Sequence, residues 1–413
     1  MRAVCTALEI VFWVCVALIV WTQIGYALTV AVLARLLAPA PRASGTSLER
    51  AQIPPHQRVS LIVAAHDEQA VIDAKVANAL ALDYPRELLQ VIVACDGCAD
   101  ATAERARAAG ADLVLELARG GKIAAQNAAV QRAHGEIVAF SDANSLWEPS
   151  ALTELVGAFA DPRVGYACGR VHFVRDADAE DPDRGRAAGR LTGAAHPQGT
   201  PHATNQEGVY WRYEMALRTR ESRLCSITAG NGAIYATRRE SYIVVDPIMG
   251  HDLSFPFNMV KRRWRAVEVP AARATEKMVP SIEGEWRRKR RMMSHTWPIV
   301  LRGGMLSPRG YTPGYALMIF SHRLLRYATP FLHTLALAAN VALVANGAGT
   351  LYAVTLALQL ALLGAAALAT AVPVRAMLIA RYYVLTTASP AAGLWDWLRH
   401  GTAASWEVAE GTR

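Results

Sequence analysis

Apolar residues concentrate at the two ends of the chain, while the middle alternates short apolar runs with mixed polar stretches. No Asp, Glu, Lys or Arg occurs from Ile10 to Ala34, and none occurs from Tyr327 to Val374. At about 1.5 Å per helical residue, the first run can cross the roughly 30 Å hydrocarbon core of a bilayer once, and the second can cross it twice. We therefore predict a membrane anchor at 1–37 and two transmembrane helices within 327–374.

Two further stretches near the C-terminus are expected to lie at the membrane surface. Within 378–413, the uncharged run at 382–395 is short for a span, so we expect a re-entrant or interfacial helix, with a third C-terminal span as the alternative. Within the basic segment 280–326, the stretch 314–325 mixes polar and apolar residues and is expected to form an amphipathic helix on the inner surface.

The middle of the chain, at 57–275, predicts a soluble domain in which short apolar strands alternate with helices. This β-α-β-α order is typical of parallel strands joined by crossover helices, as in a Rossmann-like α/β sheet. Ligands of such sheets bind at the carboxyl ends of the strands. Strands are expected at 59–64, 89–94, 113–117 and 136–141, and helices at 70–81, 99–109 and 122–133.

A stretch rich in Asp, Gly, Pro and Arg at 175–205 interrupts this domain and is expected to be a mobile surface loop or an insertion. An ordered helix is expected to resume with the aromatic residues Tyr210, Trp211 and Tyr213. Aromatic faces suit sugar rings, so these residues either line a groove for an acceptor or pack in the core.

Composition and charge narrow the function classes. With 53% hydrophobic and 19% charged residues, the chain is too apolar for an ordinary soluble protein. The net charge is +8, and basic residues cluster at 261–265 and 287–291. These clusters favour contact with a membrane surface. Alternatively, they bind substrate phosphates or form a solvated face. No helix-turn-helix or zinc-finger spacing accompanies them, so no nucleic-acid partner is expected. The six cysteines set no disulfide framework and are expected to be free thiols.

Polar residues collect where three of the predicted strands end. The sequences are AHDE at 65–68, CDGCAD at 95–100 and SDAN at 141–144. Acidic loops at strand ends favour the binding of ribose hydroxyls and a hard cation. The chain has neither GxGxxG after the first strand nor GxxxxGK[ST], which argues against a dinucleotide site and a P-loop.

Five segments in order resemble the family-2 glycosyltransferases. These are enzymes of the GT-A fold that include membrane-embedded synthases of cellulose, chitin, hyaluronan and poly-N-acetylglucosamine. The resemblance covers about 57–295 and implies an α/β fold of the GT-A type, with a cytoplasmic catalytic domain flanked by transmembrane helices. The segments are VSLIVAAHDEQAVI, VIVACDGCADAT, GGKIAAQNAAVQRAHGEIVAFSDAN, TAGNGAIYATRRE and MGHDLSFPFNMVKRRWRAVEVP.

The resemblance also implies how a donor sugar nucleotide is held. His66, Glu68 and Asp96 match positions that bind the uracil and ribose of a UDP-sugar. Lys122 and Asn127 match the Gly-Lys-x-x-Ala-x-Asn pattern on the nucleotide side of the pocket.

The resemblance places the metal ligands after the last of these strands. Asp142 and Asn144 stand in the DxD position, which coordinates Mg²⁺ or Mn²⁺ across the two phosphates. A hard cation prefers oxygen ligands and often uses one or two carboxylates together with phosphate. Asn144 departs from the pattern because its amide brings no charge, so the metal is expected to bind more weakly or to depend mainly on Asp142.

The acceptor side of the predicted site is implied by two motifs. Asp252 stands where the family has its acidic acceptor motif, and it would act as the general base that deprotonates the acceptor hydroxyl. The preceding His251 replaces the usual acidic residue. The alternative for Asp252 is a helix N-cap. Gly230 and Asn231 lie in a glycine-rich stretch that allows close approach to a sugar, or that forms only a tight turn.

A last motif differs from that of the polymerising synthases. They carry Gln-x-x-Arg-Trp, whose Trp stacks beneath the acceptor sugar. Here Arg288 matches the arginine, whereas Glu285 replaces the Gln and Lys289 replaces the Trp. Either Arg288 or its neighbour Arg287 is expected to clamp the diphosphate. Trp286 either supplies the missing platform or anchors the chain at the membrane interface.

These features predict an inverting glycosyltransferase of the bacterial inner (plasma) membrane. It would move a hexose or N-acetylhexosamine from a UDP-sugar to a growing cell-surface polysaccharide or exopolysaccharide, with Mg²⁺ or Mn²⁺, and with membrane lipid and further secretion-complex subunits as expected partners. The first alternative is transfer of a single sugar to a lipid-linked acceptor. The second is a catalytically silent nucleotide-sugar sensor or scaffold, which the departures at Asn144 and His251 allow.

Overall fold

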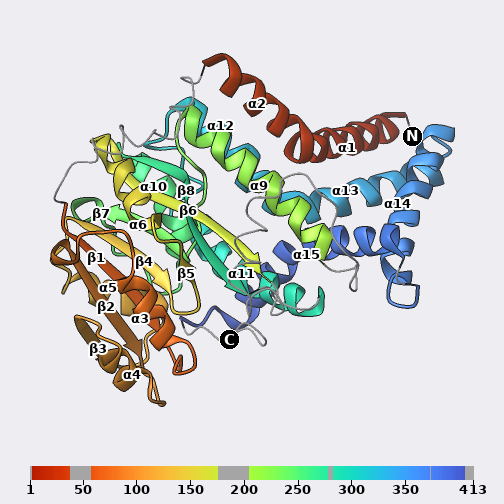
Figure 1. The fold of residues 1–413 in the computed structure, drawn as a ribbon. Coiled ribbons are helices and arrows are strands. Elements are labelled where there is room, and N and C mark those ends of the chain that lie inside the picture. Colours follow the sequence, from red (N-terminus) through yellow and green to blue (C-terminus); the bar gives the residue numbers. More distant parts are fainter. Residues whose placement is uncertain (1, 38–56, 175–203, 278–281, 373, 405–413) are drawn as a thin grey trace, which may run out of the picture.

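The computed structural model describes residues 2–37, 57–174, 204–277, 282–372 and 374–404. A domain built around one sheet lies at one end, and a helical arm formed by α1 (Arg2–Val20), α13 (Leu325–Ala345) and α14 (Thr350–Leu368) projects from it (Figure 1). The predicted loop at 175–205 falls almost wholly outside the described residues, which resume at Thr204.

Eight strands form a single mixed sheet in the order β3-β2-β1-β4-β7-β6-β8-β5. Strands β3, β2, β1 and β4 are parallel, and β7 runs antiparallel to both β4 and β6. Strand β8 is parallel to β6, and β5 is antiparallel to β8. The strands are β1 (Val59–Ala65), β2 (Leu89–Asp96), β3 (Leu113–Leu117), β4 (Ile137–Asp142), β5 (Leu146–Trp147), β6 (Val164–Val174), β7 (Ile234–Arg238) and β8 (Arg265–Lys277).

The parallel half confirms the predicted α/β order. Every residue of β1 is buried, as expected for a parallel strand that is covered on both faces. The crossover helices are α3 (Ile72–Leu80), α4 (Thr102–Ala108) and α5 (Lys122–Val130). The predicted strands end within a residue or two of the observed ones, because apolar β-branched runs bounded by polar loops mark strands well.

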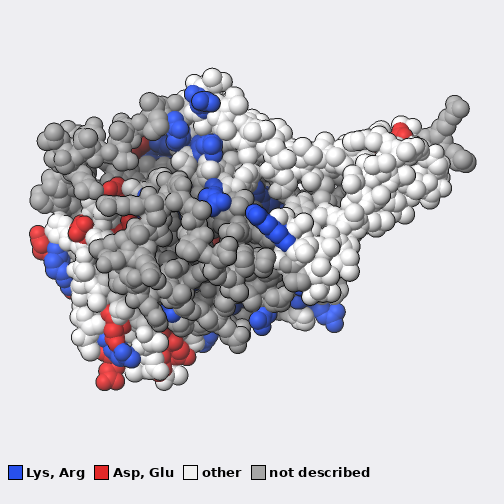
Figure 2. All heavy atoms as spheres, turned by 45° about the vertical axis from the view of Figure 1, so that its right-hand side comes forward, with Lys and Arg blue, Asp and Glu red and all other residues white. Residues whose placement is uncertain are grey.

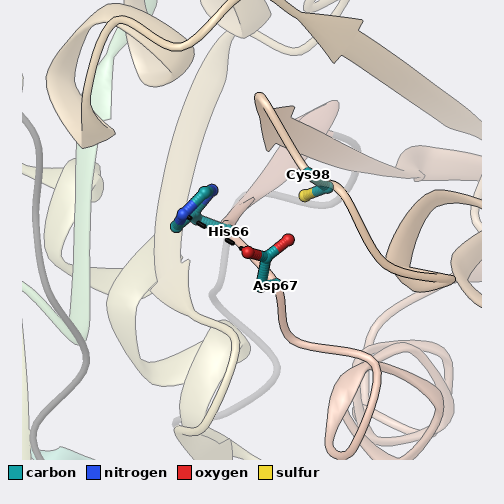
Figure 3. A group of neighbouring side chains, drawn as sticks. All are labelled: His66, Asp67 and Cys98. Carbon is teal, nitrogen blue, oxygen red and sulfur yellow. Dashed lines mark ion pairs between the residues drawn. The ribbon is translucent and has the colours of Figure 1, made fainter.

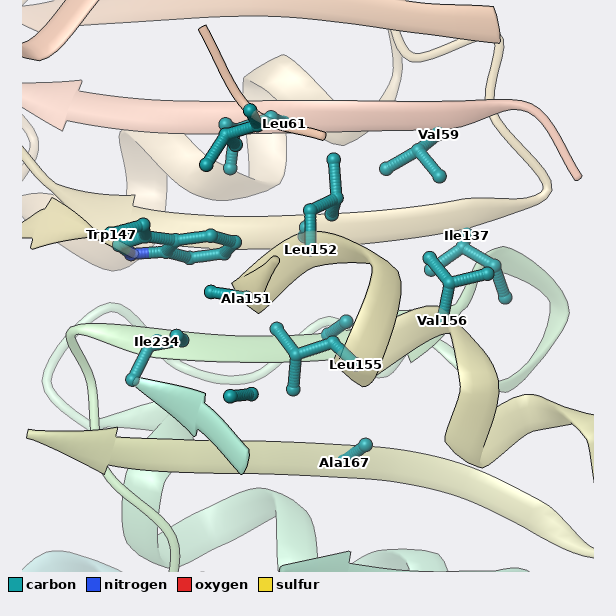
Figure 4. Close-up of a cluster of buried hydrophobic side chains, with 14 of the residues drawn as sticks. Val59, Leu61, Ile137, Trp147, Ala151, Leu152, Leu155, Val156, Ala167 and Ile234 are labelled. Atoms are coloured by element: carbon teal, nitrogen blue, oxygen red, sulfur yellow. The ribbon is translucent and has the colours of Figure 1, made fainter. Parts of the chain in front are cut away.

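A buried apolar cluster joins the two halves of the sheet beneath α6 (Ala151–Gly157). Figure 4 shows Leu152 and Leu155 of this helix lying against side chains of the strands, among them Leu61 and Ile234. Each fully buried side chain of this kind contributes about 1.5–3 kcal/mol of hydrophobic stabilisation. The cluster therefore fixes the parallel strands relative to the antiparallel ones, and with them the loops at the strand ends.

Three helices of the described residues are long and apolar enough to cross a membrane, namely Ala3–Leu37, Pro313–Ala345 and Thr350–Leu368. They fall where the uncharged runs predicted spans. The N-terminal helix passes through a π-helical turn at Trp21–Gly25 into α2 (Tyr26–Leu37). It packs against the C-terminal helices, where the rings of Phe12 and Tyr352 meet edge to face at 5.7 Å.

The stretch 314–325 is not a surface helix, so that prediction was wrong. It forms α12 (Pro313–Met318) and a π-helical turn (Ile319–Leu324), and the helix continues without a break into α13. The side chain of His322 is fully buried and Arg323 is 9% exposed. Charged residues can lie there because buried carboxylates face them.

These carboxylates belong to α9 (Thr204–Leu224). Glu221 accepts a hydrogen bond from the Tyr26 hydroxyl at 2.6 Å, and the Nδ1 atom of His322 lies 2.6 Å from it. Glu214 pairs with Arg326 and lies 3.3 Å from the Nε2 atom of His322. We call these five residues the junction network. It ties the N-terminal helix, the sheet domain and the C-terminal helices together.

The uncharged run at 382–395 lies inside a longer helix, α15 (Arg375–His400). This helix packs along α11 (Ile282–Leu301) and against α14. The Trp297 indole donates a hydrogen bond to the Pro390 carbonyl at 2.8 Å, and Arg290 pairs with Asp396 at 2.5 Å. The last helix is therefore fixed to the basic segment that follows the sheet domain.

Candidate active site

The first two predicted loops meet at the ends of β1 and β2. The Nδ1 atom of His66 lies 2.7 Å from the backbone oxygen of Asp96. The Asp96 carboxylate is buried and accepts hydrogen bonds from the backbone N–H groups of Gly120 and Gly121 at 2.6 and 2.9 Å. Glu68 is also buried, and its backbone N–H donates to the Thr102 hydroxyl at 2.7 Å. The structure thus places His66 and Asp96 side by side, with Asp96 fixed by the turn that precedes α5.

The turn before α5 requires glycine. Gly121 has φ +91°, and a Cβ there would lie 2.0 Å from the carbonyl oxygen of Ala404. The chain beyond α15 therefore returns to the sheet domain and touches the loop that holds Asp96. Thr402 secures this return with a hydrogen bond to the Ser294 carbonyl at 2.9 Å.

A group of three potential metal ligands lies beside this loop. The ligand atoms of His66, Asp67 and Cys98 lie within 4.8 Å of one another (Figure 3). Cys98 is partly exposed, and its hydrogen bond with Cys95 lowers the pKa of the Cys98 thiol to about 7. The sequence predicted free thiols, and the described structure agrees.

The predicted metal position lies at the end of β4. Asp142 is half-buried and pairs with the ammonium group of Lys122, the first residue of α5. Lys122 also approaches the Gly232 carbonyl at 3.4 Å. The structure thus joins Asp142 and Lys122, and Asn144 follows in the turn that is closed by a hydrogen bond from the Ser145 N–H to the Asp142 carbonyl at 3.2 Å.

Two charged residues that sequence reasoning missed face this turn, the buried Lys75 and the half-buried Glu276. Lys75 donates to the Ser145 carbonyl at 2.6 Å, and burial lowers the pKa of Lys75 to about 7. Glu276 lies near the end of β8, and burial together with the Asp142 carboxylate raises the pKa of Glu276 to about 7. The predicted domain ended at 275, one residue short of Glu276. In the sequence, Glu276 is marked only by the small residues Ala272 and Ala274, which alternate with polar residues just before it.

Asp252 lies in the first turn of α10 (His251–Lys261). Gly250 is the N-cap of this helix, so Asp252 does not cap it, and its half-buried carboxylate receives no hydrogen bond within the part of the chain that the structure describes. Its backbone carbonyl accepts a hydrogen bond from the Gly230 N–H at 2.7 Å. Burial raises the pKa of Tyr235 well above its usual value, and Asp142 and Asp252 both add to the rise. Both carboxylates therefore lie within electrostatic reach of one side chain.

The neighbouring His251 points into the core instead. Its Nδ1 atom lies 2.7 Å from the Tyr235 hydroxyl, and its ring stacks on Phe255 with centroids 4.0 Å apart. Burial, followed by the charge of Lys122, lowers the pKa of His251 to about 3. His251 is therefore neutral at physiological pH and supports the helix that carries Asp252.

Two predicted binding residues make contacts within the domain. Asn127 accepts a hydrogen bond from the Tyr242 hydroxyl at 2.7 Å and donates to the Val245 carbonyl at 3.4 Å. Asn231 donates to the Gly169 carbonyl at 2.6 Å and accepts from the N–H groups that begin β7. Asn231 therefore shapes the glycine-rich turn.

The glycine at 230 is needed for close packing, since a Cβ there would lie 2.0 Å from the Tyr166 hydroxyl. Together with the hydrogen bond from Gly230 to the backbone of Asp252, this contact seats the turn against the start of α10. The turn therefore fixes where Asp252 lies.

Comparison with known proteins identifies the family. The model of the family described as "Glycosyltransferase like family 2" matches residues 54–294, which is more than half of the chain. The chain belongs to this family. Its sheet has the GT-A fold that the sequence predicted.

Three similar proteins place this glycosyltransferase among known ones. The mannosyltransferase PcManGT from Pyrobaculum calidifontis, solved with GDP-Man and Mn²⁺, aligns with a TM-score of 0.63 at 23% identity over 94% of this chain and 99% of its own. Glucosyl-3-phosphoglycerate synthase from Mycobacterium tuberculosis, solved with Mn²⁺, UDP and phosphoglyceric acid, gives a TM-score of 0.40 at 18% identity over 62% of this chain and 82% of its own. The beta-monoglucosyldiacylglycerol synthase of Synechocystis is 30% identical over 161 residues, 37% of this chain, and the chain spans 33% of that relative's length.

The basic helix after the sheet borders the site of this glycosyltransferase. Arg288 is paired with Glu285 at 2.6 Å, and its charge opposes part of the rise in the pKa of Glu276. Lys289 lies 3.4 Å from Glu285 and donates to the Tyr382 hydroxyl of α15 at 2.8 Å. Arg288 therefore lies near the predicted metal position, whereas Lys289 holds two helices together.

The aromatic residues after the long loop pack within the protein. The Trp211 indole donates to the Val171 carbonyl at 3.2 Å and its ring meets Phe173 edge to face. The Tyr213 hydroxyl donates to the Gln23 carbonyl of the N-terminal helix at 3.0 Å. These contacts favour packing over an open acceptor groove, and the side chain of Tyr210 lies outside the described residues.

Proposed function

We propose that this glycosyltransferase transfers a hexose or N-acetylhexosamine from a UDP-sugar to an acceptor at the membrane, with inversion at the anomeric carbon. The observation that supports this most is that one glycine-rich turn contacts both parts of the site. Lys122, the partner of Asp142, approaches the Gly232 carbonyl of this turn at 3.4 Å, and the Gly230 N–H of the same turn donates to the Asp252 carbonyl at 2.7 Å. A donor diphosphate near Asp142 and an acceptor hydroxyl near Asp252 would then lie close to each other at the strand ends.

The donor set at the end of β4 suits a hard cation. Asp142 offers a half-exposed carboxylate and Asn144 a neutral amide oxygen, and both are oxygen donors of the kind that Mg²⁺ and Mn²⁺ prefer. We propose that these two residues hold the ion. When bound, it would neutralise charge that develops on the leaving diphosphate. Lys122 would take over part of that role, because its ammonium group already pairs with Asp142.

Asp252 is proposed as the general base. As the acceptor oxygen bonds to the anomeric carbon from one face, the bond to the UDP oxygen breaks on the other, and the hydroxyl proton passes to the Asp252 carboxylate. The carboxylate is suited to this because it receives no hydrogen bond in the described part of the chain. A backbone hydrogen bond from the Gly230 N–H to the Asp252 carbonyl fixes the position of Asp252 relative to the glycine-rich turn.

The general-base assignment predicts that Asp252→Asn abolishes transfer and leaves UDP affinity within about twofold of wild type. Removing a general base costs about 10²–10⁴-fold in rate, whereas the nucleotide contacts lie on other loops. Transfer is measured with a radiolabelled donor and UDP affinity by calorimetry. Glu240→Gln, on an exposed carboxylate, is the matched control. Loss of UDP binding in the Asp252 variant would contradict the assignment.

The acceptor is proposed to be lipid-linked. Lys289 stands where polymerising synthases have the Trp platform, and its bonds to Glu285 and Tyr382 use that position to join α11 to α15. Single addition to a lipid is therefore favoured over processive elongation. The name of the Synechocystis relative also describes the synthesis of a glycolipid. A growing polysaccharide is the second candidate, because the resemblance to polymerising synthases covers the whole domain.

We place the enzyme in the bacterial plasma membrane as a multi-pass protein, with its catalytic domain on the cytoplasmic side. Lys and Arg side chains gather where the arm joins the domain, whereas the arm itself is almost uncharged in the view of Figure 2. This distribution follows the positive-inside bias. Membrane lipid would surround the arm, and subunits of a secretion complex are proposed partners if the acceptor is a polymer.

One experiment tests donor and acceptor together. Purified protein in lipid nanodiscs is given Mn²⁺ and a panel of radiolabelled UDP-sugars and GDP-mannose, and the products are divided between an organic extract and a polymer-retaining filter. Label in the extract from a UDP-sugar supports the proposal, and label on the filter would support the polysaccharide instead. Transfer from GDP-mannose alone would contradict the UDP assignment. Binding of UDP without any transfer would favour the silent sensor.

A further inference from the structure

We propose that Glu276 supplies a second carboxylate to the cation site and so replaces the charge that Asn144 lacks. The inference rests on the proposed function, because it concerns the metal that would act there. Asp142 is the last residue of β4 and Asn144 lies in the turn that follows it, in the parallel half of the sheet. Glu276 comes from β8, in the other half.

The strand register brings Glu276 to this loop. Strands β5 and β8 are antiparallel, with Trp147 opposite Ala274 and Leu146 opposite Thr275. One further step in the same register sets Glu276 opposite Ser145, whose N–H donates to the Asp142 carbonyl. Asn144 lies one residue before Ser145. The backbone alone therefore places Glu276 across from the DxD-like turn.

The pleat of β8 directs the side chain of Glu276 inward. Successive residues of a strand point to opposite faces, so Glu276 shares a face with Ala274 and Ala272. Those two alanines are buried in the cluster beneath α6, together with Trp147. Glu276 continues this row and is half-buried, at the point where the row reaches the site.

One oxygen of Glu276 lacks a partner there. Within the described ranges, its Oε1 atom is inaccessible to solvent and has no hydrogen bond of standard geometry, although the nearby Ser145 hydroxyl lowers the pKa of Glu276 somewhat. A buried polar oxygen without a partner costs free energy, of the order of 1–3 kcal/mol. The nearby lysines have other principal acceptors, since Lys75 donates to the Ser145 carbonyl and Lys122 to Asp142. A divalent cation bound at Asp142 would supply the missing partner.

The charges of the site fit this assignment. Mg²⁺ and Mn²⁺ are commonly held by one or two carboxylates, with phosphate oxygens completing the shell. The resemblance to DxD enzymes implies two carboxylates from one loop, and this chain has one. Glu276 would restore the second from a different strand, so the cation would bridge the two halves of the sheet.

The proposal is tested by Mn²⁺ binding to the full-length protein in detergent, without nucleotide. Free Mn²⁺ is followed by its electron paramagnetic resonance signal. We expect Glu276→Gln to weaken Mn²⁺ binding by at least about tenfold, in the range seen when groups that support a metal are removed. Glu148→Gln, an exposed carboxylate close to the same turn, is the matched control and should bind like wild type.

A double variant that moves the carboxylate to another position distinguishes the loss of a metal ligand from a general loss of stability. Adding Asn144→Asp to Glu276→Gln returns the lost carboxylate on the original loop and should recover most of the Mn²⁺ affinity. If Glu276→Gln does not fold, as judged by its UDP binding and melting temperature, Glu276→Asp retains the charge on a shorter arm and should bind Mn²⁺ measurably more weakly than wild type. Wild-type Mn²⁺ affinity in the folded Gln variant, or in Glu276→Asp if Gln does not fold, would overturn the proposal.

The outcome also separates this inference from the proposed function. Asp142→Asn should abolish Mn²⁺ binding if the cation site lies at the end of β4. If Asp142→Asn loses Mn²⁺ binding and Glu276→Gln binds Mn²⁺ like wild type, Glu276 is not a ligand but the cation site at Asp142 stands. If both variants bind Mn²⁺ like wild type, the proposal of a cation site at the end of β4 is itself contradicted.

Discussion

The position of Cys98 in a loop at the end of a strand changes the pKa of its thiol. Cys98 follows the strand end at Asp96 and stands beside His66 and Asp67, at the edge of the proposed nucleotide pocket. The hydrogen bond with Cys95 lowers the pKa of the Cys98 thiol to about 7, whereas burial raises the pKa of the Cys168 thiol to about 12. Two cysteines of one domain therefore differ strongly in how readily they form the reactive thiolate.

We predict that N-ethylmaleimide modifies Cys98 before the other cysteines of the catalytic domain. The thiolate fraction of Cys98 grows as the pH rises through about 7, so the labelling rate should increase from pH 6 to pH 8 and then level off. Mass spectrometry of peptides identifies the modified site.

UDP should slow this labelling, because the nucleotide is proposed to occupy the neighbouring loop. Cys98→Ser should remove the fast phase and Cys168→Ser should not. Fast labelling that maps to Cys225, or that UDP leaves unchanged, would contradict the placement of the pocket.

Local sequence patterns could indicate only part of the proposed site. Asp96, Lys122 and Asp142 could be proposed because each ends a strand or begins a helix, and strand ends meet at one edge of a parallel sheet. Glu276 could not, because its proximity to Asp142 depends on β8 pairing with β5, a long-range register that no local pattern encodes. His251 looked like a site residue by position, yet the turn of α10 directs its ring into the core.

At the scale of elements, buried charge explains the one helix that was mispredicted. The stretch 314–325 has the mixed composition of a surface helix, and the sequence does not reveal that Glu214 and Glu221 face it from α9. His322 and Arg326 are tolerated inside because these carboxylates compensate them. Two π-helical turns meet at the same place, where the Trp21 indole donates to the Ser321 hydroxyl at 3.0 Å.

The junction network predicts a large loss of stability for Glu221→Gln. Removing the Glu221 charge leaves the neighbouring Arg323 partly uncompensated in a buried site and weakens the contacts of Glu221 with Tyr26 and His322, which costs about 3–5 kcal/mol. The melting temperature of the purified protein in detergent should fall by several degrees. Glu104→Gln, on an exposed carboxylate of α4, is the control and should melt like wild type. Equal melting temperatures for the two variants would show that the network contributes little.

At the scale of the whole molecule, the arm and the sheet domain form a continuous structure through α9, α11 and α15. The C-terminal chain returns from α15 to Gly121, so the end of the last helix reaches the loop that holds Asp96. Composition predicted where the long apolar helices lie, because uncharged runs of this length are typical of helices that can cross a bilayer. It could not predict how the parts dock, because docking depends on a few polar contacts between segments that are far apart in the sequence.

The orientation of the arm gives the last prediction. If Ala3–Leu37, Pro313–Ala345 and Thr350–Leu368 each cross the membrane, the turn between α13 and α14 at Asn346–Gly349 emerges on the side opposite to the catalytic domain. Alkaline phosphatase, which is active only outside the bacterial cytoplasm, should therefore be active when fused after Gly347. It should be inactive when fused after Arg107 on the surface of the sheet domain.

Green fluorescent protein, which folds in the cytoplasm, should give the reverse pattern at the same two positions. This paired readout separates wrong orientation from poor expression, because each fusion site must be bright in one reporter and dark in the other. Phosphatase activity at both sites would place the catalytic domain outside the cytoplasm, away from cytoplasmic sugar nucleotides. Fluorescence at both sites would mean that α13 and α14 enter the membrane without crossing it, and the acceptor would then have to be reached from the cytoplasmic face alone.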